Sequence, residues 1–148
     1  MKSYRDSEVF KEAKRLGIEI HKMSMILPRF EMYKEGSQIR RSAKAVASLI
    51  VEGYGRGRYK QDFIKYLVYS QSECDETILH LDFLFETESL KNEMLYNELK
   101  TEYDTLSKRI NNSFNGLKIT LMISLNLKIK YPQSVPTGSW YPVTVTGN

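Results

Sequence analysis

The chain has 148 residues, one cysteine and a formal net charge of +4, which arises from 22 basic and 18 acidic side chains. This length is typical of one domain that buries a single core without disulfides or a structural metal. No apolar run approaches the roughly 20 residues that span a bilayer, and the N-terminus lacks the pattern of a secretion signal. We therefore expect a cytoplasmic protein without a membrane partner.

The charges are distributed unevenly along the chain. Residues 1–66 have a balance of +7, residues 67–108 have a balance of −7, and residues 109–148 contain four basic side chains and no acidic one. Such a division serves contact with nucleic acid, or it allows acidic helices of one subunit to meet basic helices of another. Charge alone does not choose between these two uses.

The first predicted helix begins at Asp6 or Ser7, either of which can cap it, and ends at Pro28. Its apolar side chains recur at a helical period and are Phe10, Ala13, Leu16, Gly17, Ile20, Met23 and Leu27. Residues 29–36 are expected to form a connection. Three large side chains of this connection should fold back over the end of the bundle, namely Phe30, Met32 and Tyr33.

The second predicted helix is capped by Ser37 and carries the densest basic segment of the chain. Its core positions are spaced by three and four residues, and they are Ile39, Ala43, Val46 and Ile50. The alternating glycines of residues 53–58 should end this helix, because glycine costs backbone entropy inside a helix.

Two further helices are predicted, separated by a turn at residues 87–92. The apolar side of the third helix consists of Phe63, Tyr66, Leu67, Ser70, Cys74, Ile78, Leu81 and Phe85. That of the fourth helix consists of Leu95, Leu99, either Glu102 or Tyr103, Leu106, Ile110 and Phe114. The single thiol, Cys74, should be buried and unreactive. Four long helices with short connections predict an all-α, antiparallel up-and-down four-helix bundle.

The pattern changes at Leu117. From there to Ile129 apolar and polar residues alternate, which is typical of a strand; the alternative is that the fourth helix continues and frays. Residues 131–148 are rich in proline and turn residues and predict an irregular tail. We therefore divide the chain into a four-helix bundle at residues 1–118 and a C-terminal extension at residues 119–148, which is strand-like or disordered.

The middle of the chain resembles a known family. The residues that carry the resemblance are Gln38-Ile39-Arg40-Arg41-Ser42-Ala43, Val46, Ile50, Glu52-Gly53, Gly55-Arg56, Asp62-Phe63-Ile64, Tyr66-Leu67, Ser72, Cys74-Asp75-Glu76-Thr77 and His80-Leu81. In this order they resemble the four-helix-bundle proteins of the 23S rRNA intervening-sequence type over about residues 7–118. That family is related to the accessory variability protein of diversity-generating retroelements. Ala47 and Leu49 depart from the pattern, since many members have proline and asparagine there.

The resemblance implies a fold, an assembly and partners. It implies a four-helix bundle that forms a ring-like homopentamer and has no known catalytic activity. It also implies contacts with nucleic acid, and with a protein of the reverse-transcriptase type, through basic outer surfaces. The leucine at position 49 puts in doubt any role that the asparagine has in other members.

Six clustered basic side chains are the candidate nucleic-acid-binding residues: Arg40, Arg41, Lys44, Arg56, Arg58 and Lys60. Clustered cations gain free energy by releasing counterions from phosphates, and Tyr54 and Tyr59 are placed to stack on bases. The alternative is a solvated helix face with ordinary ion pairs. The glycine-rich segment is not a Walker-type phosphate loop, because it lacks the Gly-Lys-Ser or Gly-Lys-Thr sequence.

Metal binding and catalysis are weakly supported. Glu76 and His80 are one helical turn apart, but di-metal sites in bundles use Glu-x-x-His twice, and the other histidine, His21, lies outside such a motif. We expect His80 to make a structural bond between helices, and we expect no metal, no cofactor and no enzymatic activity. The leading hypothesis is a non-enzymatic, oligomeric RNA- or DNA-binding protein. Its rival is an oligomeric adaptor or scaffold that binds protein and not nucleic acid.

Overall fold

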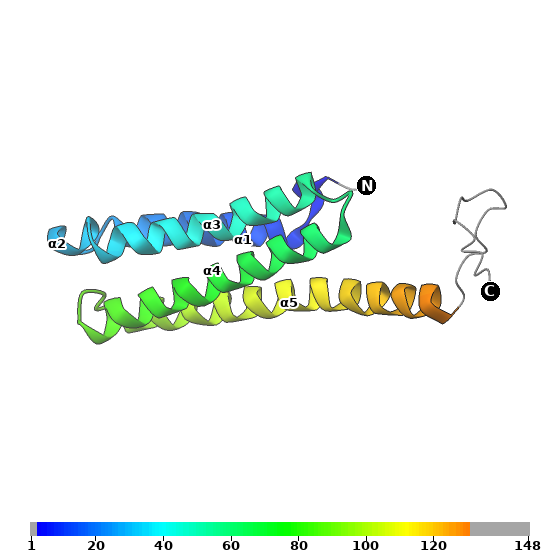
Figure 1. The fold of residues 1–148 in the computed structure, drawn as a ribbon. Coiled ribbons are helices and arrows are strands. Elements are labelled where there is room, and N and C mark those ends of the chain that lie inside the picture. Colours follow the sequence, from blue (N-terminus) through cyan, green and yellow to red (C-terminus); the bar gives the residue numbers. More distant parts are fainter. Residues whose placement is uncertain (1–2, 131–148) are drawn as a thin grey trace, which may run out of the picture.

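The computed structural model describes residues 3–130, and these residues are almost entirely helical. The elements in chain order are η1 (Tyr4–Asp6), α1 (Glu8–Ser24), α2 (Arg29–Met32), α3 (Glu35–Gly55), α4 (Lys60–Glu86) and α5 (Glu93–Lys130). Helices α1 and α3 lie side by side, and α4 and α5 run beneath them (Figure 1). The predicted all-α four-helix bundle is confirmed. None of the helices within residues 3–130 has the length and apolar character needed to cross a membrane.

The starts of α1 and α5 follow side-chain caps. The Ser7 hydroxyl accepts a hydrogen bond from the Phe10 N–H at 3.3 Å, and the Asn92 side-chain oxygen accepts one from the Leu95 N–H at 3.1 Å. Helix α3 differs from the prediction, because it begins at Glu35. The predicted cap, Ser37, therefore lies inside the first turn, where its N–H bonds to the carbonyl of Lys34.

The glycines end α3 later than expected. The helix continues through Gly53 and ends at Gly55, and α4 begins at Lys60. Gly53 is buried where α4 comes close, since a Cβ added there would lie 3.2 Å from the Cβ of Tyr66. Close packing of two helices thus outweighs the entropic cost of one glycine. The remaining residues, 56–59, form the α3–α4 turn.

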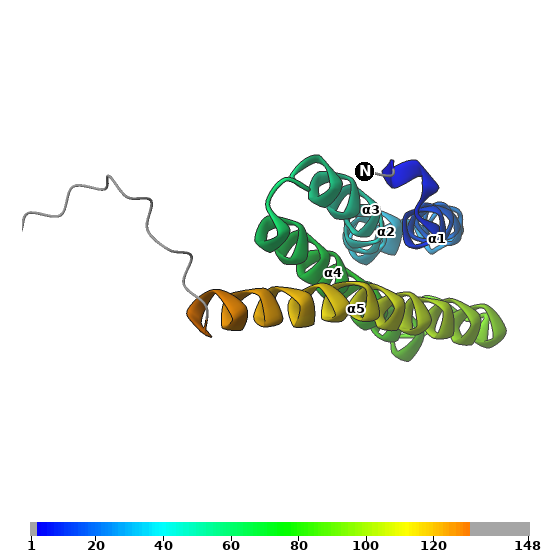
Figure 2. The same ribbon diagram turned by 90° about the vertical axis from the view of Figure 1, so that its right-hand side faces the viewer.

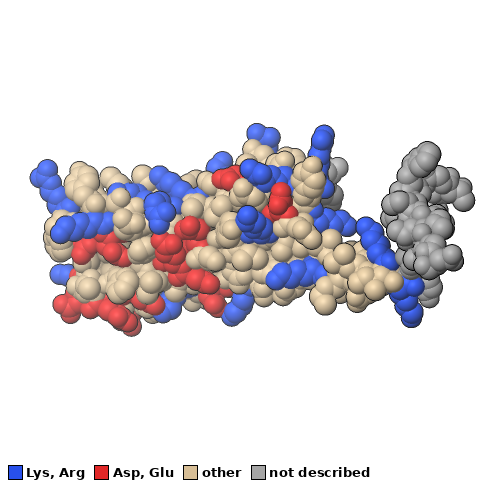
Figure 3. All heavy atoms as spheres, viewed as in Figure 1, with Lys and Arg blue, Asp and Glu red and all other residues tan. Residues whose placement is uncertain are grey.

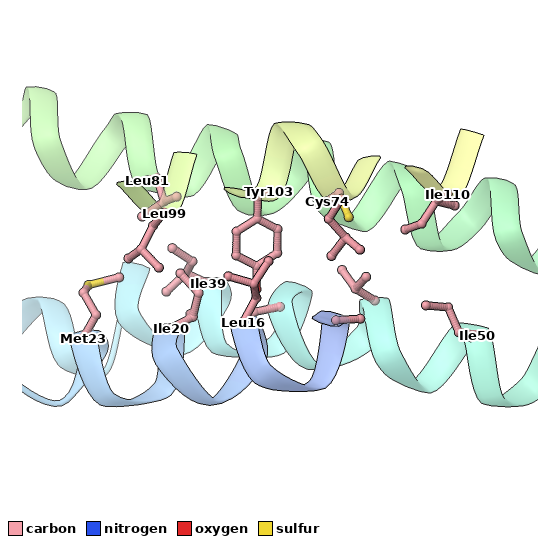
Figure 4. Close-up of a cluster of buried hydrophobic side chains, with 14 of the residues drawn as sticks. Leu16, Ile20, Met23, Ile39, Ile50, Cys74, Leu81, Leu99, Tyr103 and Ile110 are labelled. Carbon is pink, nitrogen blue, oxygen red and sulfur yellow. The ribbon is translucent and has the colours of Figure 1, made fainter. Parts of the chain in front are cut away.

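The core is a row of apolar side chains contributed by all four long helices. Figure 4 shows Leu16 and Ile20 of α1 pointing toward Tyr103 of α5. The predicted core of the second helix is confirmed in full, since Ile39, Ala43, Val46 and Ile50 are buried. In α4 the buried face is rotated from the predicted one and consists of Ile64, Leu67, Ser70, Cys74, Thr77, Leu81 and Leu84.

Two hydroxyl groups are buried on the α4 face. The Ser70 hydroxyl donates to the carbonyl of Val46 at 2.8 Å, and the Thr77 hydroxyl lies 2.9 Å from the Ser42 hydroxyl, to which it can donate. Small polar side chains that are satisfied in this way can be buried. Ser70 was predicted on this face, whereas Thr77 was not. Phe85, predicted in the core, is half-buried and stacks on Tyr96 at a centroid distance of 4.1 Å.

The segment after α1 does not fold its aromatic side chains over the bundle. It contains the single helical turn α2, in which Phe30 is 65% exposed, and Tyr33 after it is 71% exposed. The prediction that they fold back is therefore wrong for both aromatic residues. The α2 turn instead contacts α3 through its main chain, because the Met32 carbonyl accepts a hydrogen bond from Arg40 of α3.

Helix α5 continues to Lys130, so the strand interpretation of residues 117–130 is wrong and the alternative of a continuing helix is correct. A helix bonds its own backbone groups, whereas a lone strand needs a partner, and residues 3–130 contain no strand. The helix crosses the predicted domain boundary at 118/119 without a break, and this boundary stays a prediction. Its last turns project beyond the rest of the bundle (Figure 2). The predicted irregular tail, residues 131–148, lies outside the described residues.

Candidate nucleic-acid interface

Arg40, the first predicted nucleic-acid contact, is a structural residue. Its guanidinium group donates to the Ser24 hydroxyl at 3.0 Å and to the Met32 carbonyl at 2.9 Å. It thereby connects the end of α1, the turn α2 and helix α3. Gly36 makes room for this group, because a Cβ at that position would lie 3.3 Å from Arg40 Nη1 and 2.9 Å from the carbonyl oxygen of Glu31. The Arg40 guanidinium group therefore has a structural role within its own chain.

Arg41 and Lys44 point away from the core on α3. The Arg41 side chain is 63% exposed and donates to Glu76 Oε1 of α4 at 3.0 Å. An exposed ion pair of this kind contributes little to stability, and it can open when a phosphate competes for the arginine. Lys44 is exposed and makes no ion pair within residues 3–130.

The α3–α4 turn presents three exposed cations, Arg56, Arg58 and Lys60, which we call the turn cations. None of them forms an ion pair among the described residues. The guanidinium of Arg56 lies 5.3 Å from the ring centroid of Tyr66, which orients it without neutralising it. Tyr59, between the other two, is 68% exposed. A short turn therefore combines three positive charges with one free aromatic ring.

The two halves of the predicted site are separated in space. Arg56 follows Arg40 by 16 positions along continuous helix, which corresponds to about 24 Å along the axis of α3. Arg40, Arg41 and Lys44 therefore belong to one region, and the turn cations belong to another at the far end of the helix. The sequence prediction of one cluster is wrong in this respect.

Tyr54 is not placed to stack on a base. It is half-buried and packs edge-to-face on Phe63, with ring centroids 5.2 Å apart. Sequence reasoning missed Lys65, which is exposed on α4 with its ammonium group 5.7 Å from the ring centroid of Tyr69. The signal for it was present, since Lys65 follows Lys60 by five residues and continues the basic segment.

Other polar side chains form hydrogen bonds at the α3–α4 interface. His80 Nδ1 is hydrogen-bonded to Glu35 Oε1 of α3, and its Nε2 lies 3.4 Å from Glu76 Oε1. This confirms the predicted structural bond between helices. Residues 3–130 contain no group of three or more His, Cys, Asp or Glu side chains that could hold a metal ion.

Burial removes the ordinary reactivity of the one thiol in the chain. Cys74 is fully buried, as predicted, and burial together with neighbouring Asp75 and Glu73 raises the pKa of its thiol well above the usual value. The thiolate that acts as a nucleophile is thus disfavoured. This geometry supports a packing role for Cys74.

These features define a class of protein: a four-helix bundle in which several polar residues hold neighbouring helices together, and in which the connection between α3 and α4 presents three exposed cations. The model of the 23S rRNA-intervening sequence protein family matches residues 5–112, and the chain therefore belongs to this family. Many of the residues that carried the resemblance, among them Ser42, Thr77 and His80, lie in the α3–α4 contact.

A solved structure shows the same fold. It is a protein with unknown function from the S23 ribosomal protein family of Bacteroides thetaiotaomicron VPI-5482, and it matches with a TM-score of 0.64 and 20% sequence identity. The match covers 72% of this chain and 97% of that chain. The comparison with curated proteins found no match.

Proposed function

We propose that this chain is a non-enzymatic, oligomeric RNA-binding protein that contacts RNA through the turn cations. The observation that carries the proposal is the combination, on residues 56–60, of three exposed cations without ion pairs and the exposed ring of Tyr59. Cations of this kind gain free energy on binding phosphates because they release counterions, and an exposed ring can stack on an unpaired base. Lys44 and Arg41 are secondary contacts.

Family membership supports RNA as the nucleic acid. The family is described by its relation to a 23S rRNA intervening sequence, and the solved neighbour is assigned to a ribosomal protein family. By resemblance, the active form is a homopentamer, and a protein of the reverse-transcriptase type is a further candidate partner. A ring would repeat the turn cations around one axis and so multiply weak contacts with a single RNA.

The competing function is an oligomeric adaptor or scaffold that binds protein and not nucleic acid. It is favoured by the C-terminal part of α5, where large apolar side chains such as Met122 and Ile129 are exposed. Exposed apolar surface of this kind typically marks a contact with protein or lipid. One simple measurement distinguishes the two functions, namely whether the purified full-length protein binds RNA.

Fluorescence anisotropy with a labelled single-stranded RNA tests the proposal. The wild type should bind, and the triple variant Arg56→Gln, Arg58→Gln, Lys60→Gln should bind more weakly by at least about tenfold, since three phosphate contacts are removed. The matched control, Lys11→Gln, Lys14→Gln, Lys22→Gln, removes the same charge from α1 and should bind nearly as well as the wild type. Equal binding by the two triple variants would contradict the proposed site.

A further inference from the structure

The last turns of α5 leave a large apolar surface uncovered. We call residues 117–130 the α5 extension. Six of its apolar side chains are 51–79% exposed: Ile119, Met122, Ile123, Leu125, Leu127 and Ile129. They lie on the part of the helix that projects past the bundle (Figures 1 and 2). The family match ends at residue 112, so this surface lies outside it.

The extension is apolar on more than one side. At about 100° per residue, Thr120, Ser124 and Lys128 form one polar stripe, and apolar residues occupy most of the remaining circumference. A helix that is apolar nearly all round is usually covered by other structure. It also lacks the single narrow seam of a two-stranded coiled coil, which argues for a partner that receives it in a hollow.

Charge restricts the partner. The extension carries Lys118, Lys128 and Lys130, and no Asp or Glu follows Asp104 in the sequence. Two extensions side by side would place like charges together, which is unfavourable. The complementary partner is therefore an acidic surface with apolar side chains in it.

The same chain presents such a surface at the α4–α5 connection. A hollow of about 630 Å³ there is lined by the apolar side chains of Phe85 and Leu90, and by Glu86, Glu88, Lys91 and Glu93. The three glutamates are exposed, and none forms an ion pair within the described part of the chain. We call this surface the acidic hollow.

One copy cannot bring its own extension to its own acidic hollow. Helix α5 begins at Glu93 beside the hollow and runs 38 residues to Lys130, so the two sites are separated by most of a rigid helix about 55 Å long. Figure 3 shows acidic side chains at the end of the molecule that holds the α4–α5 connection, with basic ones beside them, whereas the projecting end of α5 shows basic side chains only. The complementary surfaces can meet only between copies.

We propose that the α5 extension of one copy docks on the acidic hollow of a second copy. The contact joins two different surfaces, so each copy contributes its extension to one neighbour and its acidic hollow to another. Repetition of this contact closes a ring when the rotation between neighbouring copies allows it. This inference rests on the oligomeric state in the proposed function, and it assigns the contact surfaces. Apolar side chains of the extension would cover the half-buried Phe85, and its lysines would face the glutamates.

Charge reversal tests the contact, with mass measured by light scattering on the full-length protein without nucleic acid. The extension variant is Lys118→Glu, Lys128→Glu, Lys130→Glu, and the hollow variant is Glu86→Lys, Glu88→Lys, Glu93→Lys. Each alone should lose the assembly and run at the mass of a single chain. An equimolar mixture should rise well above the mass of a single chain, because each reversed surface then finds its complement on the other variant. The two variants must alternate, and alternation closes only rings with an even number of copies, so the mixture need not reach the mass of the wild-type assembly. The control Lys11→Glu, Lys14→Glu, Lys22→Glu should assemble as the wild type does.

Circular dichroism separates loss of assembly from loss of folding in each variant. A mixture of folded variants that stays at single-chain mass overturns the inference, as does an unchanged assembly in either variant alone. A wild type that is itself a single chain contradicts the oligomer in the proposed function as well. An assembled wild type with insensitive variants contradicts only the assigned surfaces. RNA binding by the turn cations is tested separately, by comparing the wild type with the turn-cation variant.

Discussion

Arg40 donates a hydrogen bond from Nη1 to the hydroxyl of Ser24 at 3.0 Å, and that hydroxyl donates in turn to the carbonyl of His21 at 2.8 Å. Ser24 is fully buried, so the arginine completes a polar chain inside the bundle. A basic residue that resembles a nucleic-acid contact in the sequence thus holds α1 against α3. The stability of the bundle and its RNA binding should accordingly depend on different arginines.

The variant Arg40→Met keeps the aliphatic stem and removes the donors. We expect the free energy of unfolding to fall by about 1–3 kcal/mol, because a buried acceptor is left without its partner. Urea denaturation followed by circular dichroism measures the change, and Arg58→Met, in which no protein contact is lost, serves as the control. Loss of RNA binding in a fully stable Arg40→Met protein would show that Arg40 is a ligand contact after all.

The hydroxyl pair between α3 and α4 gives a second prediction. Thr77→Val removes the hydrogen bond from Thr77 to Ser42 in the buried interface and should lower the unfolding free energy by about 1–2 kcal/mol. Thr105→Val is the matched control, since each threonine hydroxyl lies within hydrogen-bond distance of the carbonyl four residues earlier in its own helix, that of Glu73 or of Thr101, and Thr105 lies on an exposed helix face. If the two variants lose equal stability, the buried pair has no special role.

The hydroxyl of Tyr103 is buried in the core and has no hydrogen-bond partner among residues 3–130. Tyr103→Phe removes this unsatisfied group while keeping the ring, so we expect the unfolding free energy to stay the same or rise by about 1 kcal/mol. Tyr96→Phe should lower it, because the Tyr96 hydroxyl donates to Asp82 at 2.7 Å. A clear loss of stability in Tyr103→Phe would reveal a partner for the hydroxyl that the structure does not show.

We expect the stability of the folded protein to depend on pH through the carboxyl group of Glu73. Burial, followed by the nearby Glu76, raises the pKa of its carboxyl group. Because the folded state binds this proton more tightly than the unfolded state, protonation of Glu73 stabilises the fold. The stabilisation is complete below the unfolded pKa of about 4.3 and is lost as the pH rises through the folded pKa. Glu73→Gln should therefore be more stable than the wild type at pH 7, by less than about 1 kcal/mol because the group is partly solvated.

Thermal melts of this variant and the wild type from pH 3 to pH 7 check the sign of the effect. The difference in melting temperature should vanish at the acidic end and open as the pH rises. Glu98→Gln, at an exposed position on α5, is the control. A Glu73→Gln protein that is less stable at pH 7 would mean that the ionised carboxylate is stabilised by contacts.

The fold could be predicted from the sequence where helical periodicity was clean. In α3 the spacing of Ile39, Ala43, Val46 and Ile50 located the core face, because apolar burial dominates there. In α4 the same reasoning found Leu67, Ser70, Cys74 and Leu81 but missed Thr77, whose buried hydroxyl is satisfied by Ser42 of α3, a partner that only the three-dimensional structure reveals. Alternation after Leu117 favoured a strand, yet the helix continues because its backbone bonds need no second segment.

The candidate site was predicted in its residue types and only partly in its arrangement. Position along a helix cannot show that Arg40 turns inward to Ser24 while Arg58 stays free, since both are arginines in a basic segment. The partner of Arg40 lies 16 residues away in sequence and is brought close by the α1–α3 connection. The turn cations were recognisable as part of a basic segment, but the sequence did not separate them from Arg40, Arg41 and Lys44, because the helix continues through Gly53 and Gly55 and places the two groups far apart.

The salt dependence of RNA binding tests the central claim most directly. For single-stranded RNA, the logarithm of the association constant falls with the logarithm of salt concentration by about 0.7 per phosphate contact. The variant Arg56→Gln, Arg58→Gln, Lys60→Gln should therefore reduce the slope by about 2 relative to the wild type, for three lost contacts per copy. A wild type whose binding does not change with salt, or a variant that keeps the wild-type slope, would contradict RNA recognition by the α3–α4 turn.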